Sequence, residues 1–267
     1  MDQAGRDIER AAELIFQSQR IVVFTGAGVS TESGIPDFRS PGGIWTTFEP
    51  EDFTIQRFLS SPETRIKIWT LGRAFKFQQA FPNAAHHAIV DIEKMGKLSA
   101  VITQNIDNLH QRAGNRPTLV VELHGNMQEV VCTSCRALWS WEQVEQRVLA
   151  GEGDPRCKQC GGILKPNAVF FGEPLPVHAF MKAHEKSCRC DLFVVIGSSL
   201  VVYPAAEMPR YAKSNGAKLM IINLSDTDQD YLADMSIKGS AGEVMPRIIN
   251  AVEKRMKSAV ESHLTSL

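Results

Sequence analysis

The fold class is decided by the stretch Ile21-Val22-Val23-Phe24-Thr25-Gly26-Ala27-Gly28-Val29-Ser30-Thr31. Its first four residues form a continuous apolar run, which is typical of a parallel strand that helices bury on both faces. Similar runs occur at 100–103, 192–196 and 219–222, with a further candidate at 119–123. Apolar helical periodicity separates them, at 7–18, 84–95, 204–214 and 242–256. This alternation predicts an α/β fold with a doubly wound, Rossmann-like parallel sheet.

Gly26 and Gly28 directly follow the first predicted strand, where a glycine loop lets the backbone approach a pyrophosphate. Thr31 stands where the dinucleotide-binding motif G-x-G-x-x-G has its third glycine. A tight turn that binds no nucleotide is therefore as good an interpretation of this loop as a nucleotide site. The next residues contain Gly34 and Pro36 and predict a loop instead of a crossover helix. Such a loop could close over a cofactor, or it could be a surface turn.

Polar side chains follow four other predicted strands at their carboxyl ends, where open α/β sheets bind ligands. These groups are Gln104-Asn105-Ile106-Asp107, His124-Gly125, Gly197-Ser198-Ser199 and Asn223-Leu224-Ser225. Hydroxyl and amide groups suit phosphates and ribose hydroxyls. A histidine at this edge could act as a base near neutral pH, although most lone histidines are structural.

Two cysteine pairs, Cys132-x-x-Cys135 and Cys157-x-x-Cys160, are separated by 21 residues. Two such pairs supply the four thiolates of a closed tetrahedral zinc site, which has no open position and is therefore structural. Chance spacing and a redox pair are the alternatives.

Two stretches interrupt the alternation of strands and helices. Residues 42–83 contain aromatic-rich helical sequence, and residues 126–164 contain the cysteine pairs. We expect a helical insertion and a zinc-ribbon insertion that together form a smaller domain beside the sheet. Residues 1–41, 84–125 and 165–267 would form the larger, Rossmann-like domain. The segment 165–173 returns to the sheet as extended chain, which could pair with a peptide or be a buried linker.

The bulk composition excludes some classes of protein. The chain has 267 residues, a net charge of -1 and a sequence pI of about 6.7, which disfavours nucleic acid and anionic membranes as partners. The sequence contains no apolar run long enough for a membrane span, and residues 1–20 lack the apolar core of a secretory signal. We therefore expect a cytoplasmic protein, and a monomer because no assembly element is apparent.

Taken together and in this order, the motifs resemble the sirtuin family, in particular its compact bacterial and archaeal members. The matching sequence spans residues 21–242. It comprises Gly26-Ala27-Gly28-Val29-Ser30, Gly34-Ile35-Pro36-Asp37-Phe38-Arg39, Thr103-Gln104-Asn105-Ile106-Asp107, His124-Gly125, the four cysteines, Lys165-Pro166-Asn167, Val169-Phe170-Phe171-Gly172-Glu173, Gly197-Ser198-Ser199-Leu200 and Ile222-Asn223-Leu224. The ordered set is far more specific than any single motif.

The resemblance implies an NAD-dependent protein lysine deacetylase that releases nicotinamide and O-acyl-ADP-ribose. NAD is then a co-substrate that lies between the sheet and the smaller module, and the metal is one structural zinc ion. His124 would act as general base on a ribose hydroxyl, and Asn105 would be the second catalytic residue. The residues expected to hold NAD are Gly26, Ala27, Gly28, Ser30, Thr31, Asp37, Phe38, Arg39, Gln104, Asn105, Ile106, Asp107, His124, Gly197, Ser198, Ser199, Asn223, Leu224, Ser225 and Ala241.

The resemblance also implies that acetylated-lysine peptides or proteins are the partners. The peptide would pair as a strand between two segments, formed by Val169, Phe170, Phe171, Gly172 and Glu173 and by Leu200, Val201, Val202 and Tyr203. Members that prefer succinyl or malonyl groups share a Tyr-x-x-Arg pair, and the matching positions here hold Trp69 and Gly72. Arg73 lies one residue after the position that matches the arginine of this pair, and on a helix its side chain would point about 100° away from that position. We therefore expect a preference for acetyl or uncharged acyl groups.

Two other functions stay open. An NAD-dependent protein ADP-ribosyltransferase would keep NAD and change the acceptor. A non-catalytic zinc-ribbon regulator would bind NAD or a peptide without turnover, and the presence of His124 and Asn105 argues against it. A nicotinamide dehydrogenase is disfavoured by Thr31 and by the loop 34–39.

Overall fold

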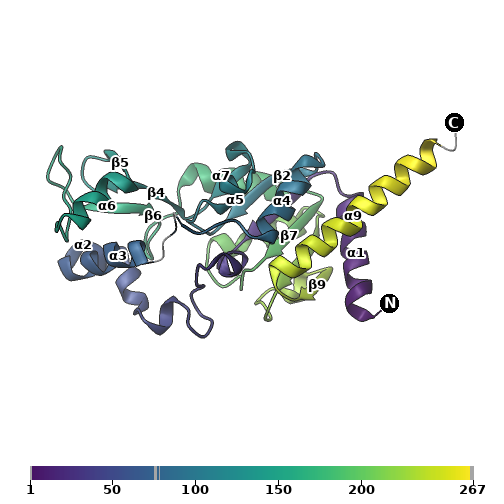
Figure 1. Ribbon diagram of the computed structural model, residues 1–267, viewed down its shortest axis with the longest axis horizontal. Helices are drawn as coiled ribbons and strands as arrows, with labels where there is room; N and C mark the ends of the chain where they lie inside the picture. Colours follow the sequence, from purple (N-terminus) through teal and green to yellow (C-terminus); the bar gives the residue numbers. More distant parts are fainter. Residues whose placement is uncertain (1, 75–76, 78, 265–267) are drawn as a thin grey trace.

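The computed structural model of the chain describes residues 2–74, 77 and 79–264. Figure 1 shows an elongated molecule with two lobes. The larger lobe contains a parallel sheet, and the smaller lobe carries three helices, α2 (Ile55–Ser60), α3 (Pro62–Ala74) and α6 (Trp141–Leu149). Within the described residues, none of the helices combines the length and the apolar content needed to cross a membrane.

The large sheet has six parallel strands in the order β3-β2-β1-β7-β8-β9. Their bounds are β1 Ile21–Thr25, β2 Leu98–Thr103, β3 Val120–Glu122, β7 Leu192–Ile196, β8 Lys218–Asn223 and β9 Met235–Lys238. The direction of winding reverses between β1 and β7, which is where doubly wound sheets bind ligands. The predicted α/β fold is therefore confirmed.

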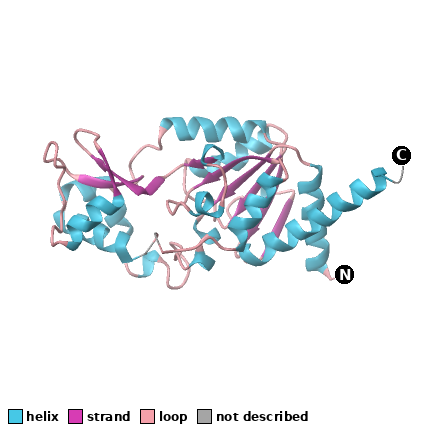
Figure 2. Ribbon diagram, turned by 45° about the horizontal axis from the view of Figure 1, so that its top comes forward, coloured by secondary structure: helices cyan, strands magenta, loops and turns pink. Residues whose placement is uncertain are grey.

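Helices cover both faces of this sheet (Figure 2). On one face, α1 (Gln3–Gln17), α4 (Ala84–Lys94) and α9 (Ala241–Leu264) pack against Ile21 and Val23. On the other face, α7 (Val177–Arg189) and α8 (Met208–Ser214) pack against Val22 and Phe24. Burial of both faces explains why the strands consist of uninterrupted apolar residues.

The register aligns the carboxyl ends of the central strands. Thr25 at the end of β1 pairs with Thr103 of β2 and with Ile196 of β7, and Ile196 in turn pairs with Ile222 of β8. The polar residues that follow these strands therefore meet at one edge of the sheet. Figure 1 shows that the smaller lobe lies beyond one end of the large sheet, and that α9 extends from the opposite end of the molecule.

The smaller lobe has its own three-stranded sheet in the order β5-β4-β6, in which both pairings are antiparallel. The strands are β4 Gly125–Cys132, β5 Leu138–Ser140 and β6 Leu164–Ala168. Its apolar core includes Phe58, Trp69, Trp141 and Leu164, so helices from residues 55–74 pack on strands that flank the cysteines. We call this lobe the small module.

The remaining short elements are α5 Leu109–Ala113 and the 3-10 turns η1 Ala27–Val29, η2 Thr31–Ser33, η3 Ile44–Thr46, η4 Pro50–Phe53, η5 Pro117–Leu119, η6 Ala205–Glu207 and η7 Asp230–Leu232. The helix expected at 204–214 is divided into η6 and α8, with Pro209 in the first turn of α8. The helix expected at 242–256 continues to Leu264. Helix α7 and strand β9 were not predicted from the sequence.

Candidate active site at the carboxyl edge of the sheet

The glycine loop packs directly against the turn that follows β7. The Gly28 N–H donates to the Gly197 carbonyl at 2.9 Å. A Cβ atom on Gly26 would lie 2.7 Å from that carbonyl oxygen, and one on Gly28 would lie 2.9 Å from it. Only glycine lets these two stretches of backbone come so close. The turns after β1 and β7 therefore form one cradle at the edge of the sheet.

Residues 34–40 form a loop, as predicted, and no α-helix follows the glycine loop directly. The Asp37 carboxylate accepts hydrogen bonds from the backbone N–H groups of Arg39 at 3.0 Å and Ser40 at 2.8 Å. Arg39 Nη1 donates to Ser199 Oγ at 3.3 Å. The loop therefore reaches across the cradle to the turn after β7, and Phe38 is partly exposed beside it.

A chain of hydrogen bonds ties the end of β2 to the glycine loop. Asn105 Nδ2 donates to the Gly26 carbonyl at 3.2 Å and to Ser30 Oγ at 3.1 Å. Ser30 Oγ donates in turn to the Asp107 carboxylate at 2.7 Å. Both bonds made by the Asn105 side chain use Nδ2, so its Oδ1 is available to a ligand.

Asp107 carries a carboxyl group that is shielded from water, since the residue is only 4% exposed. Burial raises the pKa of this carboxyl, while hydrogen bonds from the Leu109 backbone N–H and the Ser30 hydroxyl act in the opposite direction. Acidic groups are rarely buried so completely without a role. Asp107 is suited to accept a hydrogen bond from an amide N–H of a ligand.

His124 lies in the turn after β3, with its Nδ1 atom 2.9 Å from the Gln104 carbonyl oxygen. Because a carbonyl can only accept, Nδ1 carries the proton and Nε2 is left unprotonated. Burial lowers the pKa of His124 below its usual 6.5, although the Gln104 carbonyl raises it. The imidazole is therefore neutral at pH 7 and can take up a proton at Nε2.

The polar residues after β7 and β8 form a more open group. Gln104 Nε2 donates to Ser198 Oγ at 2.8 Å, which joins this group to the end of β2. Asn223 Nδ2 donates to the Ser225 carbonyl at 3.0 Å, and the Leu224 side chain between them is exposed. Ile106 and Thr31 are partly buried, and Ala241 is buried at the start of α9.

Two residues that the sequence analysis did not single out fix the glycine loop. Glu32 accepts hydrogen bonds from the Gly242 N–H at 2.6 Å and from Ser240 Oγ at 3.2 Å, which joins the loop to the start of α9. Asn83 Nδ2 donates to the Val29 carbonyl at 2.8 Å. An asparagine before an apolar-periodic helix is a recognisable N-cap, so Asn83 could have been found, whereas Glu32 gives no such signal.

The segment 169–173 is held on two sides. The Val169 N–H donates to the His124 carbonyl at 2.8 Å. On the other side, Phe171 donates to the Phe53 carbonyl at 2.9 Å and accepts from the Ile55 N–H at 3.0 Å. The segment therefore connects the turn that carries His124 with the start of α2.

A buried ion pair closes this segment on itself. Lys165 Nζ lies 3.0 Å from the Glu173 carboxylate and donates to the carbonyls of Pro166 and Ala168. Burial lowers the pKa of Lys165, and Glu173 acts against this. In the second segment expected to bind the peptide, Leu200 is buried and adopts a positive φ of 58°, so the stretch 200–203 starts from an uncommon backbone conformation.

A cavity of about 100 Å³ lies in the small module and is lined by Gly72, Arg73, Phe77, Gln79, Met127, Trp141 and Glu145. A Cβ atom on Gly72 would lie 2.5 Å from the Trp141 ring, so glycine is needed for this packing. Arg73 lines the cavity together with Gly72. Adjacent residues on a helix can both border one cavity, so the offset of Arg73 from the position of Gly72 stays a prediction.

The four cysteines form the zinc site of the small module. Their Sγ atoms all lie within 4.8 Å of one another, with Cys132 and Cys160 separated by 3.5 Å and Cys135 and Cys157 by 3.7 Å. A tetrahedral zinc ion with bonds of about 2.3 Å requires sulfur atoms about 3.8 Å apart. The cluster fits that geometry, and its four ligands leave no open position for catalysis.

Comparison with known proteins agrees with this geometry. The Sir2 family profile matches residues 26–204. The chain is 47% identical to NAD-dependent protein deacylase 2 of Archaeoglobus fulgidus over 94% of this chain and 98% of that protein. It is similar to a Sir2–p53 peptide–NAD+ complex, with a TM-score of 0.84 and 41% identity over 91% of this chain and 97% of that one. It is also similar to Sir2Af2 bound to a myristoylated histone peptide, with a TM-score of 0.77 and 42% identity over 96% and 99% of the two chains. The chain therefore belongs to the Sir2 family of NAD-dependent protein deacylases.

Proposed function

We propose that NAD lies across the carboxyl ends of β1, β2, β7 and β8, in the cradle formed by the glycine loop and the turn at Gly197. The chain is an NAD-dependent protein lysine deacetylase that produces O-acyl-ADP-ribose, and NAD supplies the ribose that accepts the acyl group. In this proposal the buried Asp107 carboxyl accepts the carboxamide N–H of nicotinamide. Ser198, Ser199 and the residues from Asn223 to Ser225 hold the adenosine half.

His124 is the proposed general base, and the hydrogen bond from Nδ1 to the Gln104 carbonyl is the observation that carries this proposal. It fixes the tautomer so that Nε2 can take a proton from a ribose hydroxyl, and the lowered pKa keeps the ring neutral beforehand. Asn105 holds reacting groups through its available Oδ1. Removing His124 should lower turnover strongly without removing NAD binding.

The acyl-lysine peptide is proposed to pair as a strand between residues 169–173 and 200–203. Within the described part of the chain, neither the Val169 carbonyl nor the Gly172 N–H has a backbone hydrogen-bond partner. Unpaired backbone groups of this kind are what strand addition requires. The side chains of Phe171 and Tyr203 are partly exposed, at 45% and 53%, and are available to contact the peptide.

The acyl group is proposed to be acetyl or another uncharged acyl group. Arg73 borders the cavity of the small module, but Glu145 borders it too, so a distal carboxylate would meet an acid as well as a cation. The binding of a myristoylated peptide by Sir2Af2 supports tolerance of apolar chains in such a protein. Succinyl-lysine peptide should therefore be the poorer substrate.

We also propose a monomer in the cytoplasm that binds neither nucleic acid nor membranes, which the net charge of -1 supports. The proposed domains are the NAD-binding domain, with residues 1–41, 84–125 and 165–267, and the small domain, with residues 42–83 and 126–164. Separate apolar clusters in the two lobes support two domains, and the cluster of the small one extends to Ala168 and Phe170. Residues 75, 76 and 78 of the helical insertion lie outside the described residues.

Mass spectrometry of an acetyl-lysine peptide, incubated with the protein with and without NAD, tests the proposal. We expect deacetylation and O-acetyl-ADP-ribose only with NAD, and His124→Ala should lower turnover by about 10²–10⁴-fold. The His124→Ala protein should still bind NAD. ADP-ribose on protein instead of peptide deacetylation would favour the transferase alternative, and unchanged turnover in the variant would remove His124 from its proposed role.

A further inference from the structure

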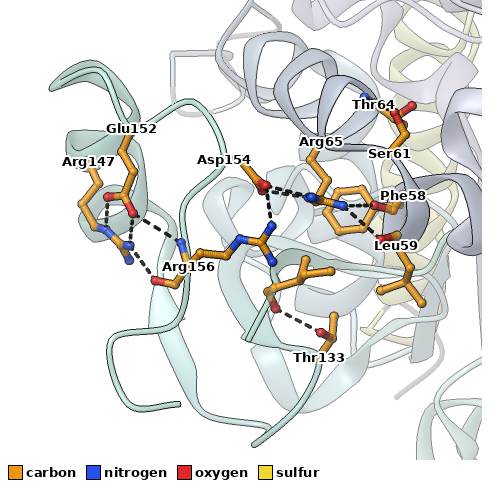
Figure 3. Close-up of polar contacts among 11 residues, drawn as sticks. Phe58, Leu59, Ser61, Thr64, Arg65, Thr133, Arg147, Glu152, Asp154 and Arg156 are labelled. Atoms are coloured by element: carbon orange, nitrogen blue, oxygen red, sulfur yellow. Dashed lines mark hydrogen bonds and ion pairs between the residues drawn. The ribbon is translucent and has the colours of Figure 1, made fainter. Parts of the chain in front are cut away.

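Arg65 of α3 is a charged residue in the interior of the small module, with only 2% of its side chain exposed. Figure 3 shows its guanidinium group between two elements that are distant in sequence. Nε and Nη2 donate to the two carboxylate oxygens of Asp154 at 2.7 and 2.8 Å. Nη1 donates to the carbonyls of Phe58 and Leu59 at 2.9 and 3.1 Å. A buried charge with this many partners is fixed in place.

On one side, Arg65 is attached to the loop that carries the second cysteine pair. Asp154 precedes the zinc ligand Cys157 by three residues. Arg156, which lies between them, forms an antiparallel β-bridge with Ile163, which follows the second cysteine pair. Arg156 Nη2 also donates to Asp154 at 2.8 Å, but its side chain is 44% exposed and, within the described residues, makes no hydrogen bond to α2. Ligation of zinc by Cys157 therefore fixes the loop that presents Asp154 to Arg65.

On the other side, Arg65 is attached to α2. The carbonyls of Phe58 and Leu59 lie in the last turn of this six-residue helix, where carbonyl groups lack partners within the helix. The opposite end of α2 meets the segment 169–173, because the Ile55 N–H donates to the Phe171 carbonyl. The Phe58 ring packs edge-on against Phe170, with ring centroids 5.0 Å apart. The short helix thus connects Arg65 with the segment proposed to bind the peptide.

We propose that Arg65 is a positioning residue for the acyl-peptide site, which joins the zinc-bearing loop to α2 and through α2 fixes the segment 169–173. The proposal rests on the proposed placement of the peptide along that segment. It assigns Arg65 no contact with NAD, because the groups that form the cradle lie on other elements. Loss of Arg65 should therefore weaken peptide use and leave NAD use unchanged.

The test compares Arg65→Met with Arg156→Met, a matched control that removes a cation from the same Asp154 without touching α2. Arg65→Met should raise the KM for acetyl-lysine peptide by roughly tenfold or more, since small misplacements of binding groups are costly. The KM for NAD should stay within about twofold, and Arg65→Lys should recover part of the peptide KM. Arg156→Met should change the peptide KM by less than about threefold, as expected for an exposed pair.

Hydrogen exchange of the zinc-loaded proteins gives a readout that does not depend on the peptide. Exchange at Ile55 and Phe171 should be faster in Arg65→Met than in Arg156→Met. Unchanged exchange, or equal rises of the KM for peptide and for NAD, would overturn the proposal. Faster exchange with an unchanged peptide KM would overturn the placement of the peptide and with it this role of Arg65. If Arg65→Met does not fold, Asp154→Asn is measured against the same control and criteria.

Discussion

The two lobes of the molecule are stabilised by different interactions. Helices of the sheet lobe carry His86, His87, His110, His178 and His184, whereas the small module carries Trp69, Trp139 and Trp141. The sheet is enclosed by two apolar clusters, one on each face. The apolar cluster of the small module includes the zinc ligands Cys132 and Cys157, and a buried arginine lies beside it.

This difference indicates that the sheet lobe depends on apolar burial, whereas the small module depends on its metal and on the ion pair of the buried Arg65. A lobe with a large apolar core can fold by itself, but a small one needs additional cross-links. The lobe that forms the cradle for NAD should therefore be robust, and the lobe that holds the peptide segment should be conditional on zinc.

Zinc removal should have the largest effect. Apparent binding energies of structural zinc are about 10–16 kcal/mol, which matches or exceeds the whole stability of a typical domain. A strong zinc chelator should unfold the small module, shift the tryptophan emission to the red and abolish deacetylation. Fluorescence and far-UV circular dichroism, recorded before and after chelation and after zinc is restored, check this. Native tryptophan emission in the zinc-free protein would contradict it.

A cavity created by mutation in the large sheet should destabilise the sheet lobe and leave the small module unchanged. Ile102 is fully buried in β2, and Ile102→Ala should lower the free energy of unfolding by about 2–5 kcal/mol. Zinc content and the native tryptophan emission should stay unchanged, because Ile102 belongs to the cluster under α7 and α8. Urea denaturation followed by far-UV circular dichroism measures the loss. A variant that also releases zinc would argue against separate stabilisation.

Acidification should destabilise the sheet lobe through its histidines. Burial, with a smaller contribution from His87, lowers the pKa of His86 from 6.5 to about 4, and burial also lowers the pKa of His110. Below pH 6.5 the unfolded chain binds protons that the folded protein does not, so stability falls as the pH drops from 6.5 towards 4.

From His86 alone, the free energy of unfolding should fall by roughly 2 kcal/mol between pH 7 and pH 5. Denaturant titrations at both pH values measure this loss. A His86→Gln variant, whose side chain does not titrate, should show a smaller loss than the unmodified protein. An equal loss in both proteins would assign the pH dependence to other groups.

Two matched helix caps should give the smallest effects. Asn83 caps α4 in the sheet lobe and Ser140 caps α6 in the small module, each within a capping box. Either change to alanine should cost about 1 kcal/mol of stability. Asn83→Ala should raise the KM for NAD, because Asn83 also holds Val29, whereas Ser140→Ala should leave it unchanged. Steady-state kinetics with saturating peptide measures the KM for NAD of both variants. Equal changes of this KM in the two variants would contradict the separate roles of the two caps.

The central strands could be predicted because both faces of the sheet are buried, so that β1 and β7 consist of uninterrupted apolar residues. The same reason explains why β9 was missed: it lies at the edge of the sheet and alternates buried and exposed residues over only four positions. The amphipathic helix α7 was missed because charged residues dilute its apolar face.

The candidate site could be predicted where its residues follow strands in the sequence, as Asn105, Asp107, His124 and Ser198 do. The contacts between these residues could not. Ser30 meets Asp107 across 77 positions, and Arg65 meets Asp154 across 89, so neither pair leaves a local pattern. Single charged residues such as Arg65 and Glu32 are usually interpreted as solvated, and only the structure reveals their contacts with distant segments.

Hydrogen exchange of the protein with and without zinc measures the separate stabilisation of the two lobes. We expect zinc removal to increase exchange in residues 42–74 and 126–173, while amides of β1, β7 and β8 keep their protection. A uniform increase across both lobes, or protection of the small module that persists without zinc, would contradict the claim that each lobe is stabilised by its own interactions.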